Sequence, residues 1–273
     1  MTTPSLPTVK LDHGIHVMHL FYRVDRERWA QLPPGGSAQA LRHLETVCAR
    51  HQAESNPRLT SYANISGKAD LAFMIYAAEL GQIGDIHREI EAGFPPGTLI
   101  RVYSYLSMTE MSEYMPTEED YRQRLVGEKV EPGTEAWEQR WAEAMQGKQD
   151  YEKHRLYPEM PDWEIMCFYP MNKRRLGADN WYSLDFAQRK KLMGGHARTG
   201  RKYAGRVTQL ITGSTGVDDW EWGVTLMAHK TDAIKEIVYE MRFDEVSARF
   251  GEFGPFYLNL RLNPAALWEH LRL

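Results

Sequence analysis

The sequence is poor in cysteine and has no excess of positive charge, and each absence excludes a class of protein. Among 273 residues only Cys48 and Cys167 are cysteines, and both have apolar neighbours, where a cysteine usually behaves as a small buried hydrophobe. Two thiols provide neither a disulfide framework nor the spacing of a cysteine-based metal site. The formal net charge of -4 argues against bulk nucleic-acid binding, which usually requires an excess of lysine and arginine.

The chain also lacks the long apolar runs of membrane and secreted proteins. No apolar stretch reaches the roughly 18–20 residues that a helix needs to cross a bilayer. The opening MTTPSLPTVK has neither the apolar run nor the cleavage-site pattern of a signal peptide. We therefore expect a cytoplasmic protein with no membrane and no nucleic-acid partner. Its 42% hydrophobic and 26% charged residues are ordinary for a globular protein with a buried core.

What the sequence does contain is one order of elements repeated twice. In the first half the pattern predicts strand, helix, strand, strand, helix and strand at residues 13–24, 41–48, 59–66, 71–77, 83–92 and 98–107. In the second half it predicts the same order at residues 163–171, 183–203, 206–213, 220–228, 231–242 and 253–262. This order is the ferredoxin-like pattern. We expect an α+β fold, with ferredoxin-like domains over 1–110 and 161–273 and an acidic helical connector over 111–160.

The helix predicted from Ser183 carries a single imidazole among small residues. Met193, His196, Ala197 and Gly200 share one face, which we expect to be buried. A glycine inside a helix costs up to roughly 1 kcal/mol relative to alanine, so Gly200 suggests close packing against the backbone. A haem iron needs one axial imidazole and a flat wall of small residues. A hydrogen-bonded core histidine is the simpler interpretation of this pattern taken alone.

Basic residues cluster around this helix although the protein as a whole is acidic. They are Lys173, Arg174, Arg175, Lys190, Lys191, Arg198, Arg201, Lys202 and Arg206. Such a local positive field suits a small polyanion. The alternative is a solvated face, or an oligomer contact paired with the acidic connector, and Arg175 and Lys190 fit that alternative.

Two further segments carry unusual residues. Tyr169 stands near the end of a predicted strand and is followed closely by Lys173, an arrangement that suits a redox-active phenol beside an ammonium group. Core packing is the ordinary explanation for a tyrosine in a strand. Residues 244–254 place polar side chains between two apolar elements, as the rim of a pocket would. Together these features indicate a planar, anionic ligand held by one histidine, and they do not name a reaction.

Longer motifs resemble one family. They are FYPMNKRR (168–175), DNWY (179–182), His196, GRKYAG (200–205), QLITGS (209–214), DDWEWGVTL (218–226) and YEMRFDEVSARFGEFG (239–254). They cover nearly all of residues 163–262 and resemble the coproheme decarboxylases of the chlorite dismutase superfamily. The first half resembles that family mainly in the order of its elements.

The resemblance implies a fold, an activity and partners. It implies two ferredoxin-like domains that form a dimeric α/β-barrel in each chain, and a homopentamer of such chains. The C-terminal domain would bind iron coproporphyrin III (coproheme), which serves as both substrate and redox cofactor. Hydrogen peroxide would drive the oxidative decarboxylation of two propionates to vinyl groups, with haem b as the product. Transient contact with the coproporphyrin ferrochelatase is also implied.

The resemblance also assigns roles to single residues. The family's iron ligand, radical-forming tyrosine and carboxylate-assisting lysine match His196, Tyr169 and Lys173. Its porphyrin-binding positions match Arg155, Met171, Arg201, Gln209 and Ser247. Among these, the two arginines and the serine match positions that hold propionates, and the glutamine matches a position on the distal side of the ring.

Gln209 separates two activities on this fold. Chlorite dismutases carry an arginine there, whose guanidinium holds oxyanions near the iron, and glutamine cannot supply that charge. Arg206, three residues earlier on the predicted strand, should point to the opposite face. The resemblance therefore favours decarboxylation over chlorite chemistry. Two rivals are a non-catalytic haem carrier or sensor, and a dye-decolourising peroxidase, which usually has a distal Asp or Arg.

Overall fold

The strands of both halves join into one antiparallel sheet in the computed structural model, which describes residues 7–52 and 56–273. The sheet has nine strands in the order β10-β5-β11-β2-β3-β1-β4-β8-β9, and a further pairing of β5 with β9 closes it into a barrel. The first half supplies β1 (His16–Val24), β2 (Arg58–Asn64), β3 (Leu71–Ala77) and β4 (Leu99–Thr109). The second half supplies β5 (Ile165–Lys173), β8 (Val207–Gly213), β9 (Trp222–Ala228), β10 (Gly251–Phe253) and β11 (Tyr257–Arg261).

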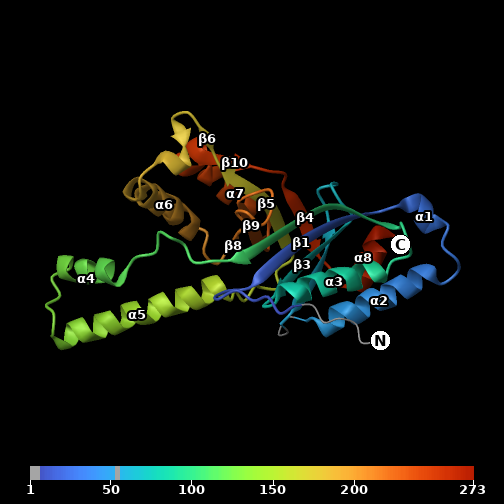
Figure 1. Ribbon diagram of the computed structural model, residues 1–273, viewed down its shortest axis with the longest axis horizontal. Coiled ribbons are helices and arrows are strands. Elements are labelled where there is room, and N and C mark those ends of the chain that lie inside the picture. The colour runs from blue at the N-terminus through green and yellow to red at the C-terminus, as the bar shows by residue number, and fades with distance from the viewer. Residues whose placement is uncertain (1–6, 53–55) are drawn as a thin grey trace. The chain divides into compact units, whose positions relative to one another are not determined.

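Helices cover the outside of both halves of the barrel (Figure 1). The strands of the first half are covered by α2 (Gly36–Arg50), α3 (Leu80–Ala92) and α8 (Pro264–Leu271). In the second half α7 (Thr231–Met241) packs on β9, and α6 (Phe186–Arg201) lies beside α7. Each half runs strand, helix, strand, strand, helix, strand, which confirms the predicted α+β class with ferredoxin-like repeats.

The buried apolar side chains form three layers. One lies between the first-half strands and α2, α3 and α8, and includes Leu44, Phe73 and Trp268. A second fills the barrel interior, where Phe21 and Phe168 meet. The third lies between the second-half strands and α7. No residue of α6 is buried, so this helix contributes nothing to the third layer's core.

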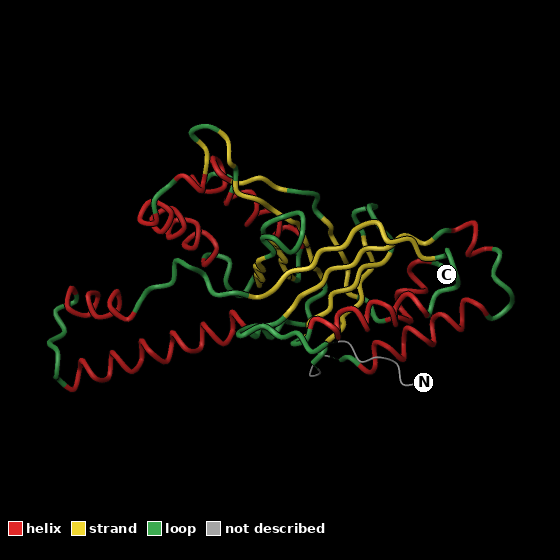
Figure 2. The backbone as a smooth tube through the Cα atoms, viewed as in Figure 1, coloured by secondary structure: helices red, strands yellow, loops and turns green. Residues whose placement is uncertain are grey.

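Residues Glu110–Glu159 form a second compact unit. Within it, α4 (Glu118–Gly127) and α5 (Glu135–Leu156) make a helical hairpin (Figure 2). Thr117 and Thr134 cap these helices, because their hydroxyls accept hydrogen bonds from the backbone N–H groups of Asp120 and Trp137 at 3.1 and 3.2 Å. In the two described ranges, no helix is both long enough and apolar enough to span a membrane.

The structure differs from the sequence pattern near the C-terminus. The strand predicted over 253–262 is divided into β10 and β11. Between them the Gly254 N–H donates to the Pro170 carbonyl at 2.9 Å, and a Cβ on Gly254 would lie 2.7 Å from Pro170 Cγ, so only glycine fits here. The pattern also misses α8, which begins with Asn263 as its cap. It misses a short hairpin of β6 (Arg175–Leu176) and β7 (Asp179–Asn180) as well.

Asn64 and Asn259 join the two halves where β2 meets β11. They are register partners, and Asn64 Nδ2 donates to Asn259 Oδ1 at 2.8 Å. Asn259 also donates to the carbonyls of Met166 and Tyr257, at 3.2 and 2.9 Å. Asn259 is only 1% exposed, so water cannot replace these partners.

We expect Asn259→Ala to lower the free energy of unfolding by about 2 kcal/mol, because it leaves buried polar groups without partners. Urea unfolding of Asn64→Ala, Asn259→Ala and the double variant should give a coupling energy of about 1 kcal/mol. If the losses in unfolding free energy of the two single variants simply add, this pair does not stabilise the junction of β2 and β11.

Candidate functional site

Strand β5 presents its predicted site residues on one face. Cys167, Tyr169 and Met171 belong to the apolar layer beneath α7. Phe168, which stands between Cys167 and Tyr169 in the sequence, points into the barrel interior instead. Alternation along the strand places Lys173 on the same face as Tyr169. The site residues of β5 therefore all face the helical layer of the second half.

The Tyr169 phenol lies in an aromatic enclosure. Its ring stacks on Phe256 with centroids 4.2 Å apart and tilts against Phe253 at 6.0 Å. The side chain is 5% exposed. Burial raises the pKa of Tyr169 well above its ordinary value, with a further rise from Cys167, while the charge of Arg242 opposes the shift. The phenol therefore keeps its proton at any pH near neutrality.

Lys173 is a buried cation near one aromatic ring and two carboxylates. Its Nζ lies 4.7 Å from the centre of the Trp181 ring, and its backbone N–H donates to Glu221 Oε2 at 2.9 Å. Burial lowers the pKa of Lys173 to about 8, and the negative charges of Asp244 and Glu221 limit the fall. At neutral pH the side chain is an ammonium group that burial has brought close to losing its proton.

His196 is oriented by a carboxylate that the sequence analysis did not assign to it. Its Nδ1 lies 2.9 Å from Asp244 Oδ2, and Asp244 Oδ1 accepts from the Ser247 backbone N–H at 2.9 Å. Burial alone would raise the pKa of Asp244, but the hydrogen bonds from His196 and Ser247 outweigh it and hold the pKa below the usual range. A carboxylate on one ring nitrogen leaves the other free to ligate, which is the usual arrangement of a metal-binding histidine.

The surroundings of His196 fit an axial ligand of a porphyrin iron. The side chain is 28% exposed. In the described ranges no three His, Cys, Asp or Glu side chains gather as a protein-ligated metal ion would require. A single imidazole is thus the donor set that this helix provides.

Three expectations about this helix and its neighbour are wrong. The helix begins at Phe186 after an Asp185–Gln188 capping box, and Ser183 lies in a short 3-10 turn before it. The face of His196 is not buried. Arg206 precedes β8, so strand alternation does not apply, and its guanidinium reaches Glu236 of α7 at 2.7 Å.

The structure locates the remaining predicted residues as follows. Gln209 shares the helix-facing side of β8 with Val207 and Ile211, and its Nε2 would lie 3.1 Å from a Cβ on Gly200. The close packing predicted at Gly200 is therefore made by this amide and by Met241. Arg201 is exposed at the end of α6. Arg155 belongs to the unit of residues 110–159, where its Nε donates to the Glu110 carbonyl at 3.1 Å.

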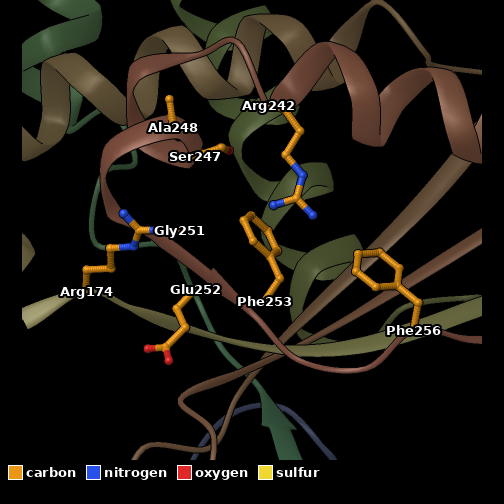
Figure 3. Close-up of a pocket in the computed structure, with 8 residues that line it drawn as sticks. All are labelled: Arg174, Arg242, Ser247, Ala248, Gly251, Glu252, Phe253 and Phe256. Carbon is orange, nitrogen blue, oxygen red and sulfur yellow. The ribbon is translucent and has the colours of Figure 1, made fainter.

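A cavity of about 670 Å³ opens among residues of the second half (Figure 3). Its lining consists of Arg174, Arg242, Ser247, Ala248, Gly251, Glu252, Phe253 and Phe256. Of the predicted site residues only Ser247 is among them. Arg174 belongs to the basic cluster noted in the sequence. Arg242 and the two phenylalanines were missed as site residues, although Arg242 and Phe253 stand within a motif that carries the resemblance.

Replacing Lys173 by methionine should stabilise the protein at neutral pH. The pKa of Lys173 lies below its ordinary value of 10.5, so burying the ammonium costs stability below pH 8, and the cost declines as the pH rises toward 10.5. We expect Lys173→Met to raise the free energy of unfolding at pH 7 by about 2 kcal/mol, and by less at pH 10. Urea unfolding at both pH values measures this. Lys191→Met, at an exposed site on α6, is the control, and a gain independent of pH would refute the explanation.

Comparison with known proteins places the chain in a family. The family model for chlorite dismutase matches residues 37–262. A heme-binding protein from Thermus thermophilus is 36% identical, with 98% of each chain covered and a TM-score of 0.78. A mutant chlorite dismutase from Candidatus Nitrospira defluvii is 16% identical, with 96% of this chain and 98% of that chain covered and a TM-score of 0.71, a likeness of fold. The chain belongs to the chlorite dismutase family.

Proposed function

We propose that this protein is a coproheme decarboxylase, which uses hydrogen peroxide to convert two propionates of iron coproporphyrin III into vinyl groups and so yields haem b. The observation that carries the proposal is the placement of Tyr169 and Lys173, both buried, on one face of β5. A protonated phenol and an ammonium group on one wall can act on the carboxylated side chains of a single flat substrate.

His196, Arg201 and Ser247 would hold the substrate. The free nitrogen of His196 would ligate the iron while Asp244 fixes the orientation of the ring. Ser247 lines the cavity, and its backbone N–H donates to Asp244. The segment 244–247 would therefore connect the iron ligand His196 with the carboxylates of the substrate. Iron coproporphyrin, once bound and treated with peroxide, supplies the oxidising equivalents.

Residues of the protein would then carry out the hydrogen abstraction and the decarboxylation. Tyr169 gives up a proton and an electron from its phenol, and the resulting phenoxyl takes a hydrogen atom from the β-carbon of a propionate. Loss of a second electron from that side chain breaks the bond to the carboxylate, releasing carbon dioxide and leaving a vinyl group. Each propionate thus consumes one peroxide and one proton and yields two waters. Lys173 stabilises the carboxylate until it leaves.

Chlorite chemistry is a weaker proposal for this member of the family. Gln209 presents a neutral amide on the helix-facing side of β8, and Arg206 is engaged by Glu236. A non-catalytic haem carrier or sensor is the second candidate, and the description of the Thermus thermophilus relative as heme-binding favours it. A carrier would bind haem b at least as tightly as coproheme. Homopentameric assembly and contact with the ferrochelatase stay predictions from the resemblance.

The decisive experiment loads the purified protein with iron coproporphyrin III, adds hydrogen peroxide stepwise and follows the porphyrin by mass spectrometry. We expect two successive losses of a carboxyl group, through a three-propionate intermediate to haem b. Tyr169→Phe should bind coproheme near normally and form no vinyl product, because its ring lacks the hydroxyl. Unchanged or bleached coproheme with the native protein would reject the decarboxylase in favour of the carrier, and activity in Tyr169→Phe would reject the tyrosine's role.

The activity should fall at alkaline pH. Because the pKa of Lys173 is about 8, the ammonium form predominates below that value and is lost above it. We expect kcat/KM for coproheme to fall about tenfold between pH 7 and pH 9, since this ratio reports ionisations of the free enzyme. The profile from pH 6 to 10 is compared with that of Lys173→Met, which should have low activity and no such fall. The same alkaline fall in both proteins would assign it to another group.

A further inference from the structure

Two arginines line the cavity, and they differ from several other arginines of the second half. Arg175, Arg206 and Arg249 each pair with a carboxylate, on Glu221, Glu236 and Glu245 respectively. In the part of the chain that the structure describes, the guanidinium groups of Arg174 and Arg242 form no ion pair, and both line the cavity. The positive charge that lines the cavity is therefore left for an anion from outside the chain.

Arg242 is fixed in position by an aromatic ring. It follows the last turn of α7, and its guanidinium carbon lies 3.7 Å from the centre of the Phe253 ring. A guanidinium stacked on a ring keeps its N–H groups free at the edge, in the planar fork that matches a carboxylate. Figure 3 shows the Arg242 guanidinium over Phe253, with Ser247 on the same wall of the cavity. Glu252, the acidic residue of the lining, points away from Arg242 in this view.

Phe253 also connects Arg242 with Tyr169. The same ring lies 6.0 Å from the ring of Tyr169, centre to centre. The charge of Arg242 acts on the phenol, because it opposes the rise in the pKa of Tyr169 that burial causes. A carboxylate bound at the edge of Arg242 would therefore lie close to the phenol that is proposed to react.

We propose that Arg242, with Arg174 across the cavity, binds the carboxylate of the propionate that Tyr169 oxidises, and so determines which propionate reacts first. This inference rests on the proposed function. A two-pronged guanidinium contact fixes a carboxylate in both distance and direction. It therefore holds the adjoining carbons at a set place relative to the phenol. Once that carboxylate has left as carbon dioxide, Arg242 loses its partner, so the site distinguishes substrate from product.

The test compares two ligands that differ in their carboxylates. The protein is titrated with iron coproporphyrin III, which has four propionates, and with haem b, which has two, and the change in the porphyrin's absorption gives each dissociation constant. We expect Arg242→Gln to weaken coproheme binding about tenfold and haem b binding about twofold at most, because only coproheme offers the carboxylate. Arg206→Gln removes the same charge outside the cavity and should leave both constants unchanged.

The order of reaction provides a second measurement. The native protein should form one isomer of the three-propionate intermediate, and Arg242→Gln should form two, which chromatography separates before mass spectrometry. Arg242→Lys keeps the charge without the fork, so it should recover binding but not the single isomer. It also keeps the test possible if Arg242→Gln fails to fold.

The possible failures are distinguishable. Equal weakening of coproheme and haem b in Arg242→Gln, or a single isomer from that variant, would overturn the role of Arg242 while the native protein still decarboxylates. Native protein that binds coproheme and does not decarboxylate it would instead reject the proposed function. In that case the ratio of the two dissociation constants would still decide whether Arg242 binds a carboxylate.

Discussion

Strand β5 is hydrogen-bonded to β9 along one edge and to β11 and β10 along the other, so it cannot shift its register without breaking the barrel. Its side chains alternate between two environments. Phe168 packs in the barrel interior, and Tyr169, Met171 and Lys173 face the helices. A slip of one residue would move the whole site to the wrong face. The candidate chemistry therefore depends on the same pairing that closes the fold.

Charge is distributed around this strand at some cost to stability. Lys173 is 9% exposed, and the two carboxylates whose charge favours its ammonium form also serve other groups: Asp244 orients His196, and Glu221 pairs with Arg175. A methionine in place of this lysine would spare the desolvation of a charge. A site that binds carboxylates needs a buried ammonium group on the face of Tyr169. Functional sites commonly keep such strained or desolvated groups at a cost in stability.

Helices α6 and α7 contribute in different ways. Helix α7 buries Ala233, Ile234 and Ile237 against the strands, whereas α6 buries none of its residues. Asp244, which follows α7, connects the two helices by binding His196, and the Ser247 N–H donates to Asp244 in turn. The helix that carries the candidate iron ligand is thus positioned by polar contacts and by its neighbour. Its own apolar packing has little part in this.

The sequence by itself determined the order of the main helices and strands of both halves, because the periods of strands and helices are local properties of neighbouring residues. Its motifs also identified Tyr169, Lys173 and His196 as candidates. The resemblance implied a barrel, but only the tertiary structure decided that β5 and β9 close it and that Asp244 orients His196. It also decided that, within the described residues, Arg174 and Arg242 form no ion pair while Arg175, Arg206 and Arg249 do. Those outcomes depend on which residues far apart in the chain meet, and neither local periodicity nor charge composition specifies such partners.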